Sequence, residues 1–262
     1  MAEEENISIA EIIDIKEVIP SVLNNQVSIS NMAARAAQGF GLREKRLVMI
    51  GVSKINSKKP LSSFNTVQSR TVRVTAQEYA EVGNVSIDCS YGELKDACEN
   101  LFNRYLRYKV TTPRGIKERK LRWIEDQTYH HGLGYVEFTF SQTVMPHLAN
   151  LFELFTKYRL AQVEGLRNLF TWRLLELLTS MTNNEYVEKK VDVSLETLRY
   201  ELEIPDSYKY ANIRERVLEP AIEELIKKDG WEISWTPKKK GRAVASIHFT
   251  YKKTAQSDLF RD

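Results

Sequence analysis

The stretch Trp231-Glu-Ile-Ser-Trp-Thr-Pro-Lys-Lys-Lys-Gly-Arg-Ala-Val-Ala-Ser-Ile-His-Phe-Thr-Tyr251 has the pattern of a β-hairpin. Side chains on one face of a strand alternate along the sequence, and two alternating apolar sets occur here. The first set is Trp231, Ile233 and Trp235, and the second is Ala245, Ile247, Phe249 and Tyr251. The segment between them, residues 237–242, predicts a basic loop. We therefore expect a hairpin with a cationic tip.

The residues before this hairpin predict a strand and two helices. Lys189–Val193 has the pattern of a short strand, and Ser194 is placed to cap a helix that ends near Leu202. A longer helix is expected between Ser207 and Lys228, where apolar residues recur at helical spacing. Its predicted core side consists of Ile213, Val217, Ala221, Ile222, Leu225 and Ile226. Pro220 lies inside this helix and must kink or restart it, because proline donates no backbone hydrogen bond.

The same order of elements occurs in the first half of the chain. Arg70–Thr75 predicts a strand, Ala76–Val82 predicts a short helix, and Ser90 is placed to cap a second helix. The apolar stripe of that second helix consists of Leu94, Ala97, Cys98, Leu101 and Tyr105. Strands are expected next at residues 108–112, 119–124 and 134–141, with a Pro113-Arg114-Gly115 turn between the first two.

Strand, helix, helix and basic hairpin form the plan of a winged-helix domain, and this plan occurs twice. We predict an α+β fold of two tandem winged-helix (helix-turn-helix) domains with β-hairpin wings. The expected organisation is an acidic extension over residues 1–24, a first domain over 25–142, a second over 143–255 and a tail over 256–262. A long helix is predicted from about Glu164 to Ser180, and the apolar run Val144–Leu160 has a helical pattern. Because this run contains no Gly/Ser linker, we expect the two domains to pack together.

Charge is unevenly distributed along the chain. The net charge is +3, but residues 1–20 hold six acidic side chains and one lysine, which leaves 37 basic and 29 acidic residues, a net charge of +8, over residues 21–262. A basic body favours a polyanionic partner. The acidic segment also has the apolar spacing of a short amphipathic helix that ends at Pro20. Either a docking or dimer element or a frayed extension accounts for this segment.

Composition excludes several classes of protein. The longest apolar stretches, such as Leu47–Val52, are far shorter than the roughly 20 residues that a membrane span needs. The acidic N-terminus does not have the pattern of a secretory signal peptide. The two cysteines, Cys89 and Cys98, cannot form a disulfide framework and are expected as free thiols. We predict a cytoplasmic protein that does not contact membranes.

No catalytic, metal or cofactor site is predicted. The Gly39-Phe-Gly41 segment lacks the Lys-Ser/Thr pair of a phosphate-binding loop. His130 and His131 are adjacent, and adjacent side chains of an extended segment point to opposite faces, so they are poorly placed to share a metal. No Ser/His/Asp or Cys/His pairing has a recognisable spacing. We predict that the chain is not an enzyme.

Basic residues of the two hairpins, and of the helices before them, are candidate contacts to a polyanion. Like charges crowded at a hairpin tip repel each other, and nucleic-acid phosphates relieve that repulsion; a solvated surface is the alternative for each position. The hairpin candidates are Lys238, Lys239, Lys240 and Arg242 in the second domain and Arg114 and Lys117 in the first. On the helices the candidates are Lys209 and Arg216, which lie clear of the apolar stripe, Arg214, which falls within its arc, and Tyr91 and Lys95 in the first domain.

Six short stretches share their order and spacing with a known family. They are Glu44-Lys-Arg-Leu47, Tyr91-Gly-Glu-Leu-Lys-Asp-Ala-Cys-Glu-Asn-Leu101, Phe155-Thr-Lys-Tyr-Arg-Leu160, Arg173-Leu-Leu-Glu-Leu-Leu178, Arg216-Val-Leu-Glu-Pro-Ala-Ile-Glu-Glu-Leu225 and Lys239-Lys-Gly-Arg242. Through them, roughly residues 31–253 resemble the replication initiators of theta-replicating, iteron-carrying bacterial plasmids. The chain departs from the family pattern at Leu175, where the family usually has tyrosine, and in its acidic extension.

The resemblance implies two winged-helix domains that bind one direct repeat of an origin, an iteron, on successive major-groove faces of double-stranded DNA. It also implies melting of an adjacent AT-rich segment with the host replication initiator, loading of the replicative helicase, and repression of its own gene as a dimer. A bacterial cytoplasmic location at the plasmid or nucleoid follows from the same resemblance. By position it assigns Lys209, Tyr210, Arg214 and Arg216 to the DNA-reading helix and Lys239, Lys240 and Arg242 to the wing. A double winged-helix transcriptional regulator and a rolling-circle nicking enzyme are the alternative functions.

Overall fold

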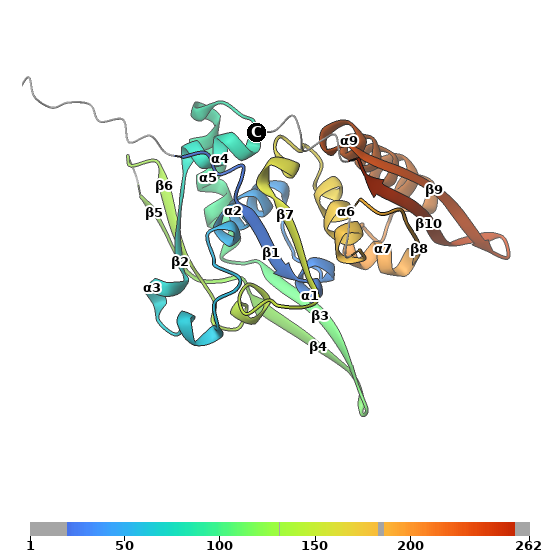
Figure 1. Ribbon diagram of the computed structural model, residues 1–262, viewed down its shortest axis with the longest axis horizontal. Coiled ribbons are helices and arrows are strands. Elements are labelled where there is room, and N and C mark those ends of the chain that lie inside the picture. Colours follow the sequence, from blue (N-terminus) through green and yellow to red (C-terminus); the bar gives the residue numbers. More distant parts are fainter. Residues whose placement is uncertain (1–19, 131, 183–185, 255–262) are drawn as a thin grey trace, which may run out of the picture.

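The chain folds into two units of mixed helix and strand that lie side by side (Figure 1). The computed structural model describes residues 20–130, 132–182 and 186–254, so the helix expected in the acidic extension lies outside the described residues. The first part contains β1 (Gln26–Ser30), α1 (Asn31–Arg35), α2 (Leu42–Ser53), η2 (Leu61–Phe64), α3 (Val67–Arg70), β2 (Thr71–Thr75), α4 (Ala76–Gly83), α5 (Ile87–Leu101), β3 (Tyr105–Thr112), β4 (Gly115–Arg122), β5 (Ile124–His130), β6 (Tyr135–Phe140), η3 (Met145–His147), β7 (Phe155–Arg159) and η4 (Leu160–Val163). Helix α6 (Leu169–Ser180) follows and contacts both α1 and α9. The second part contains β8 (Lys189–Ser194), α7 (Leu195–Glu201), α8 (Tyr210–Ile213), η5 (Arg214–Leu218), α9 (Glu219–Asp229), β9 (Trp231–Lys240) and β10 (Ala243–Lys253).

Each unit contains a three-stranded antiparallel sheet of the same topology. The strand order is β2-β6-β5 in the first unit and β8-β10-β9 in the second. In each sheet the first strand, β2 or β8, is followed by helices and then by a hairpin, β5–β6 or β9–β10. The second strand of that hairpin, β6 or β10, pairs with both other strands and so lies at the centre of the sheet. This repeated topology confirms the predicted pair of winged-helix domains.

The first unit has an additional hairpin that the second unit lacks. β3 and β4, with the turn between them, form a two-stranded sheet of their own between α5 and β5, whereas α9 leads directly into β9. We call this inserted hairpin, residues 105–122, the arm. The wing of the first unit is therefore β5–β6, and the prediction that placed it at residues 108–124 is wrong. β5 itself was missed because its sequence, Ile124-Glu-Asp-Gln-Thr-Tyr-His130, has no alternating apolar residues.

Helix α5 begins earlier than the sequence indicates. Ser86 caps it by accepting a hydrogen bond from the backbone N–H of Cys89 at 3.3 Å. The predicted cap, Ser90, is buried one turn inside the helix, where its hydroxyl donates to the carbonyl of Ile87. The predicted stripe is otherwise correct, because Leu94, Ala97, Cys98 and Leu101 are buried. Tyr105 belongs to β3.

Elements α8, η5 and α9 form one continuous helical segment, residues 210–229, which we call the reading helix. Its middle part, η5, is a π-helical turn that ends just before Pro220. Because proline has no N–H for the i→i−4 bond, a wider turn before it absorbs the break in the hydrogen-bond ladder. The break in the helix predicted at Pro220 is therefore this π-helical turn. Ile226, predicted on the core side, is 45% exposed.

The segment that connects the two units is not the predicted helix. Residues 144–160 contain η3 and the strand β7, which pairs antiparallel with β1. Thr156 and Tyr158 of β7 are buried and Lys157 between them is exposed, which is the period of a strand. Helix α6 then starts at Leu169, later than predicted, with Asn168 as its cap. The domain boundary between residues 142 and 143 stays a prediction.

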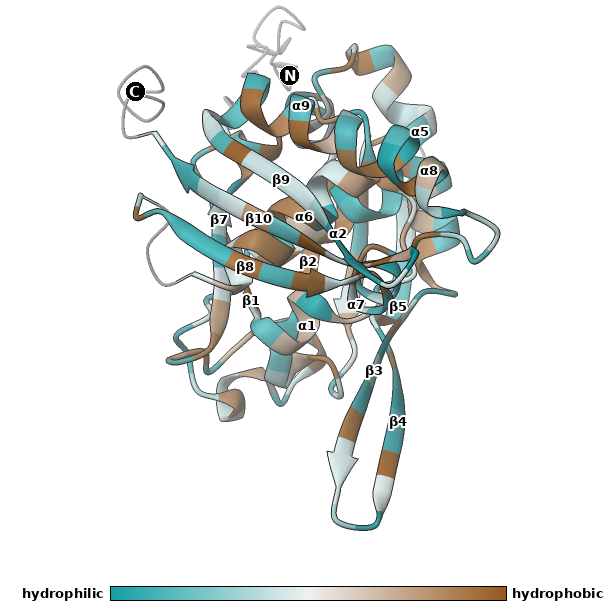
Figure 2. Ribbon diagram, turned by 90° about the vertical axis from the view of Figure 1, so that its right-hand side faces the viewer, coloured by the Kyte–Doolittle hydropathy of each residue, from teal (hydrophilic) through white to brown (hydrophobic). Residues whose placement is uncertain are grey.

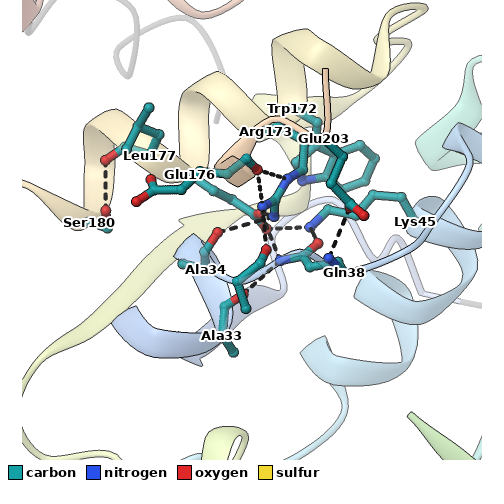
Figure 3. A network of polar contacts seen from close by, with 12 residues as sticks. Ala33, Ala34, Gln38, Lys45, Trp172, Arg173, Glu176, Leu177, Ser180 and Glu203 are labelled. Atoms are coloured by element: carbon teal, nitrogen blue, oxygen red, sulfur yellow. Dashed lines mark hydrogen bonds and ion pairs between the residues drawn. The ribbon is translucent and has the colours of Figure 1, made fainter. Parts of the chain in front are cut away.

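A buried ionic network lies between helices α2 and α6 (Figure 3). Lys45 of α2 donates to Glu176 of α6 at 2.5 Å and to Gln38 at 2.6 Å. Arg173 donates to Glu176 at 3.0 Å and also to the backbone carbonyls of Ala34, Ala36 and Glu201. The side chains of Lys45, Arg173 and Glu176 are at most 2% exposed.

This network consists of charged residues from two stretches that carry the family resemblance, residues 44–47 and 173–178. Burial lowers the pKa of Lys45 to about 8, and the carboxylate of Glu176 opposes that shift. Buried charges at this contact must stay paired, so α2 and α6 are held in one relative position. The second unit packs against them, because Arg173 donates to the backbone carbonyl of Glu201 in α7 and Arg35 pairs with the carboxylate of Glu201 at 2.8 Å. The predicted packing of the two domains against each other is confirmed.

Candidate nucleic-acid interface

The helix-turn-helix of the second unit presents the start of its reading helix to solvent. Ser194 caps α7, as predicted, by accepting a backbone N–H of the first turn at 2.9 Å. Arg199 of α7 holds the following turn together, because its guanidinium donates to the carbonyl oxygens of Pro205 and Tyr208. The N-terminal end of the reading helix is therefore fixed relative to α7, as a helix that enters a groove requires.

Two arginines of η5 extend from this end. The guanidinium of Arg216 lies over the ring of Tyr208, 5.6 Å from its centroid, and has no carboxylate within ion-pair distance among the described residues. Arg214 donates to Glu219 at 2.8 Å, and this pairing raises the pKa of Arg214. The side chain of Arg214 is 54% exposed, although regular helical spacing placed it within the apolar arc. The π-helical turn accounts for the difference, because it changes the phase of the helix.

Lys209 and Tyr210 differ in their access to a ligand. Lys209 is the exposed N-cap of the reading helix. The hydroxyl of Tyr210 is buried, and it has no hydrogen-bond partner in the part of the chain that the structure describes. Of the two, Lys209 is the side chain that a base or phosphate can reach without a rearrangement of the helix end.

The basic residues of the second wing lie mostly on a strand. β9 continues to Lys240, which pairs with Ala243 of β10, and only Gly241 and Arg242 form the turn. The predicted loop at residues 237–242 is therefore wrong. A two-residue turn with Gly241 at a φ of +66° lets the strands pair to their ends.

The lysines of this wing are not equivalent. Lys238 donates to Asp192 of β8 at 2.7 Å, and hydrogen bonds from Lys238 and His248 lower the pKa of Asp192. Lys239 and Lys240 are exposed and have no carboxylate partner within the described ranges. Together with Arg242, these two lysines are the cations of the wing that are available to phosphates.

Helix α5 occupies the corresponding position in the first unit, but its surface differs. Tyr91 is 44% exposed and lies against the turn of the β5–β6 wing, where a Cβ on Gly134 would be 2.8 Å from its ring. The Nζ atom of Lys95 is 4.0 Å from Glu99. The exposed acids of α5 include Asp88, Asp96 and Glu99. The electrostatic attraction to phosphate is therefore weaker here than at the reading helix.

Arg114 and Lys117 lie at the far end of the arm and not on the wing of the first unit. The arm projects from the body, and α5 lies toward the opposite end of the molecule (Figures 1 and 2). The predicted residues thus form three separate groups: the reading helix with its wing, the start of α5, and the arm. One exposed residue of the arm that the sequence analysis missed is Ile116, an apolar side chain between Gly115 and Lys117. The sequence feature that could have identified Ile116 is a single apolar residue within an otherwise basic hairpin.

Within residues 20–130, 132–182 and 186–254, no group of three or more His, Cys, Asp or Glu side chains is arranged to hold a metal ion. In the same ranges, no helix combines the length and the apolar composition that crossing a bilayer requires.

Comparison with known proteins identifies the family of the chain. Residues 26–179 match "Initiator Replication protein, WH1", and residues 194–251 match "Initiator Rep protein, WH2". A replication initiation protein of Escherichia coli is 25% identical over 218 residues, which make up 82% of this chain and 66% of that protein.

The fold has a solved counterpart. A crystal structure of the Pi initiator protein in complex with iteron DNA superposes with a TM-score of 0.74 at 20% sequence identity, over 89% of this chain and 99% of that one. The match to WH1 alone covers more than half of the chain, and it confirms the resemblance inferred from the sequence. The chain therefore belongs to the family of initiator replication proteins, with the two winged-helix domains WH1 and WH2.

Proposed function

We propose that this chain starts the replication of a bacterial plasmid by binding the iterons of its origin as double-stranded DNA. The observation that carries the proposal is the pairing of an exposed, basic reading-helix start with a basic wing on the same unit. The residues concerned are Lys209, Arg214 and Arg216 on the helix and Lys239, Lys240 and Arg242 on the wing. The shared fold with a protein crystallised on iteron DNA supports the same conclusion.

The two groups of cations have different tasks. Arg216 projects from the helix that enters the major groove, where a guanidinium can bind guanine through two hydrogen bonds and so report sequence. Lys239 and Lys240 lie on the wing, where they meet phosphates and contribute affinity that depends on salt but not on sequence. Tyr91 and Lys95 of the first unit, and Arg114 and Lys117 of the arm, supply further contacts to the same duplex.

Contacts between the two units give this arrangement its register. Because Arg35 of α1 and Arg173 of α6 both bind Glu201 of α7, the distance between α5 and the reading helix is set by the fold. A rigid pair selects two major-groove segments about one helical turn apart, roughly 34–36 Å along the duplex. This spacing suits one iteron read by both units.

The later steps belong to the same proposal. The first domain occupies residues 25–142 and supplies the dimer contact, and the second occupies residues 143–255. The chain acts in the bacterial cytoplasm, on plasmid DNA. As a monomer it melts an AT-rich segment with the host initiator and brings in the replicative helicase; as a dimer it represses its own gene.

The test is selection of duplexes from a randomised pool by the full chain at several salt concentrations. We expect one enriched site of about two helical turns, with two separated blocks of sequence and a steep salt dependence. A chain that enriches no sequence contradicts the proposal. To separate an initiator from a transcriptional regulator, the enriched site is placed as a tandem array beside an AT-rich segment and probed with permanganate. Opened thymines indicate an initiator, and occupancy without opening indicates a regulator.

A further inference from the structure

The arm is exposed on both faces and has no place in the winged-helix plan. Its strands pair from Tyr105 opposite Arg122 to Thr112 opposite Gly115. Strands of eight residues measure about 26 Å, and all residues from 113 to 120 are exposed. The root packs on the body through Leu106, Tyr108 and Leu121. An isolated two-stranded hairpin is only marginally stable in water, so the outer half of the arm needs a reason other than packing.

One face of the arm carries a row of cations that leads to an apolar side chain. Residues directly opposite on paired strands share a face, and this face holds Arg107 with Lys120, Lys109 with Glu118, and Thr111 with Ile116. Arg107 is paired with Glu203 and Lys109 with Glu118, at 3.2 and 3.3 Å. The arm contains seven cations, and Glu118 is its one acid. The exposed cations of its outer half that have no carboxylate partner among the described residues are Arg114, Lys117, Arg119 and Lys120. A polyanion along the outer half of the arm would relieve the repulsion among these four.

The tip of the arm has the chemistry of a wedge. Ile116 is 70% exposed, and Pro113 stands exposed at the turn beside it. Proteins that deform DNA from the minor groove insert Ile, Leu, Met, Phe or Pro between base pairs and surround the insertion with cations. The minor groove is about 6 Å wide, so it admits a turn with one apolar side chain but not the whole ribbon.

The root of the arm is fastened to the second unit. The hydroxyl of Tyr200 donates to the carbonyl of Arg107 at 2.7 Å, while the backbone of Arg107 also pairs with Ala37 of the first unit. The guanidinium of Arg107 also lies 3.2 Å from Glu203. Tyr200 is on α7, and Glu203 is in the turn that leads to the reading helix. The arm is therefore held in a defined direction relative to the side chains that read bases.

We propose that the arm deforms DNA: its tip enters the minor groove of the bound duplex, and Ile116 inserts between two base pairs. This inference rests on the proposed function, because the reading helix must first place the arm on the duplex. Insertion unstacks one base step and bends the duplex away from the wedge, and contacts of the arm's cations with the flanking phosphates offset the cost. Weakening one step in this way is a means to begin strand separation by binding alone.

The experiment compares Ile116→Ser with Leu133→Ser in the full chain. Leu133 is 66% exposed at the turn of the β5–β6 wing, so the control removes a similar apolar side chain from a hairpin turn that lacks the arm's cations. The probe is a duplex that carries the sequence enriched by the wild-type chain. Fluorophores at its two ends report bending by energy transfer, and 2-aminopurine placed at successive positions reports unstacking. Thermal melts of both variants check that each is folded.

We expect the wild type and Leu133→Ser to bring the duplex ends closer and to raise 2-aminopurine fluorescence at one step. Ile116→Ser should lose at least half of the energy-transfer change and all of the fluorescence rise, while still preferring the enriched sequence over a random duplex. Netropsin, which fills the minor groove, should abolish the wild-type bend. Equal bending by the wild type and Ile116→Ser, or a bend that netropsin leaves unchanged, overturns the inference. Failure of the proposed function is distinguishable, because then no variant prefers any sequence.

Discussion

Replacing Glu176 with glutamine should destabilise the protein far more than replacing Lys45 with methionine, although the two side chains form one ion pair. Both are fully buried. The network contains two cations, Lys45 and Arg173, and a single carboxylate between them, Glu176. Glu176→Gln leaves two buried cations without that counter-charge. Lys45→Met leaves the Arg173–Glu176 pair, at 3.0 Å, intact.

The magnitudes follow from this asymmetry. Removing one partner from a buried pair costs roughly 3–5 kcal/mol, and we expect this loss for Glu176→Gln. For Lys45, burial lowers the pKa from 10.5 to about 8 even with Glu176 beside it. At about 1.4 kcal/mol per pKa unit, keeping the ammonium charged at neutral pH already costs the folded state about 3 kcal/mol. This cost already includes the attraction to Glu176. Lys45→Met removes it but leaves the buried oxygens of Gln38 and Glu176 without the lysine donor, so we expect a net change within about 1.5 kcal/mol.

The same lysine gives a pH signature. Between pH 8 and 10.5 the unfolded chain keeps the Lys45 proton and the folded chain releases it, so the free energy of unfolding rises with pH in that window. Lys45→Met should lose this rise. Urea unfolding followed by tryptophan fluorescence measures both effects, because Trp172 lies beside Lys45. Equal losses from Lys45→Met and Glu176→Gln at neutral pH, or a rise that persists in Lys45→Met, would refute the reasoning.

Three further predictions concern DNA binding and acid stability. Arg216→Ala should cost about 1–3 kcal/mol of discrimination at one base position, measured by competition between single-substituted duplexes, and a uniform loss on all sequences would contradict its assignment to base reading. Lys239→Ala should weaken specific and random duplexes alike and lower the salt slope by about one, whereas Lys238→Ala, which removes a lysine paired with Asp192, should change that slope less. Burial lowers the pKa of His147 to about 4, so the free energy of unfolding should fall by about 3 kcal/mol as pH drops from 6.5 to 4, because the unfolded chain binds the proton first. His147→Gln should flatten this part of the stability curve, and an unchanged curve would contradict the shift.

Local patterns were sufficient where an element carries its own periodicity. The β9–β10 hairpin and the buried stripe of α5 were predicted because alternating or helical spacing of apolar residues survives in each. β7 was missed because its short alternation lies inside an apolar run, and its partner β1 stands more than 100 residues earlier in the chain. β5 was missed for the opposite reason, since a strand rich in charged residues leaves no apolar pattern to detect.

The candidate site shows a different limit of sequence reasoning. A charged residue in a motif does not reveal whether its partner is a ligand or another part of the chain. Lys45 and Arg173 are buried cations that stabilise the fold. Lys238 is paired with Asp192. Lys239 and Arg216 are also a lysine and an arginine in such motifs, but their charged groups remain accessible to a polyanion. Which role each cation takes depends on what lies opposite it across a sheet or helix contact, and only the folded chain supplies that information.

The two basic hairpins illustrate the same limit at the level of topology. From sequence alone, the arm and the second wing are equivalent, because each is a cationic hairpin that follows a pair of helices. Strand pairing separates them: β10 returns to β8 in the centre of its sheet, whereas β4 pairs with β3 alone. A wing pairs with a third strand of its sheet, so its basic side chains are held at fixed positions where they can contact phosphates. The arm is anchored only at its root, so its tip extends away from the body of the protein. In our proposal, the difference between positioning DNA and deforming it lies in which strand the hairpin joins, and not in how many lysines and arginines it carries.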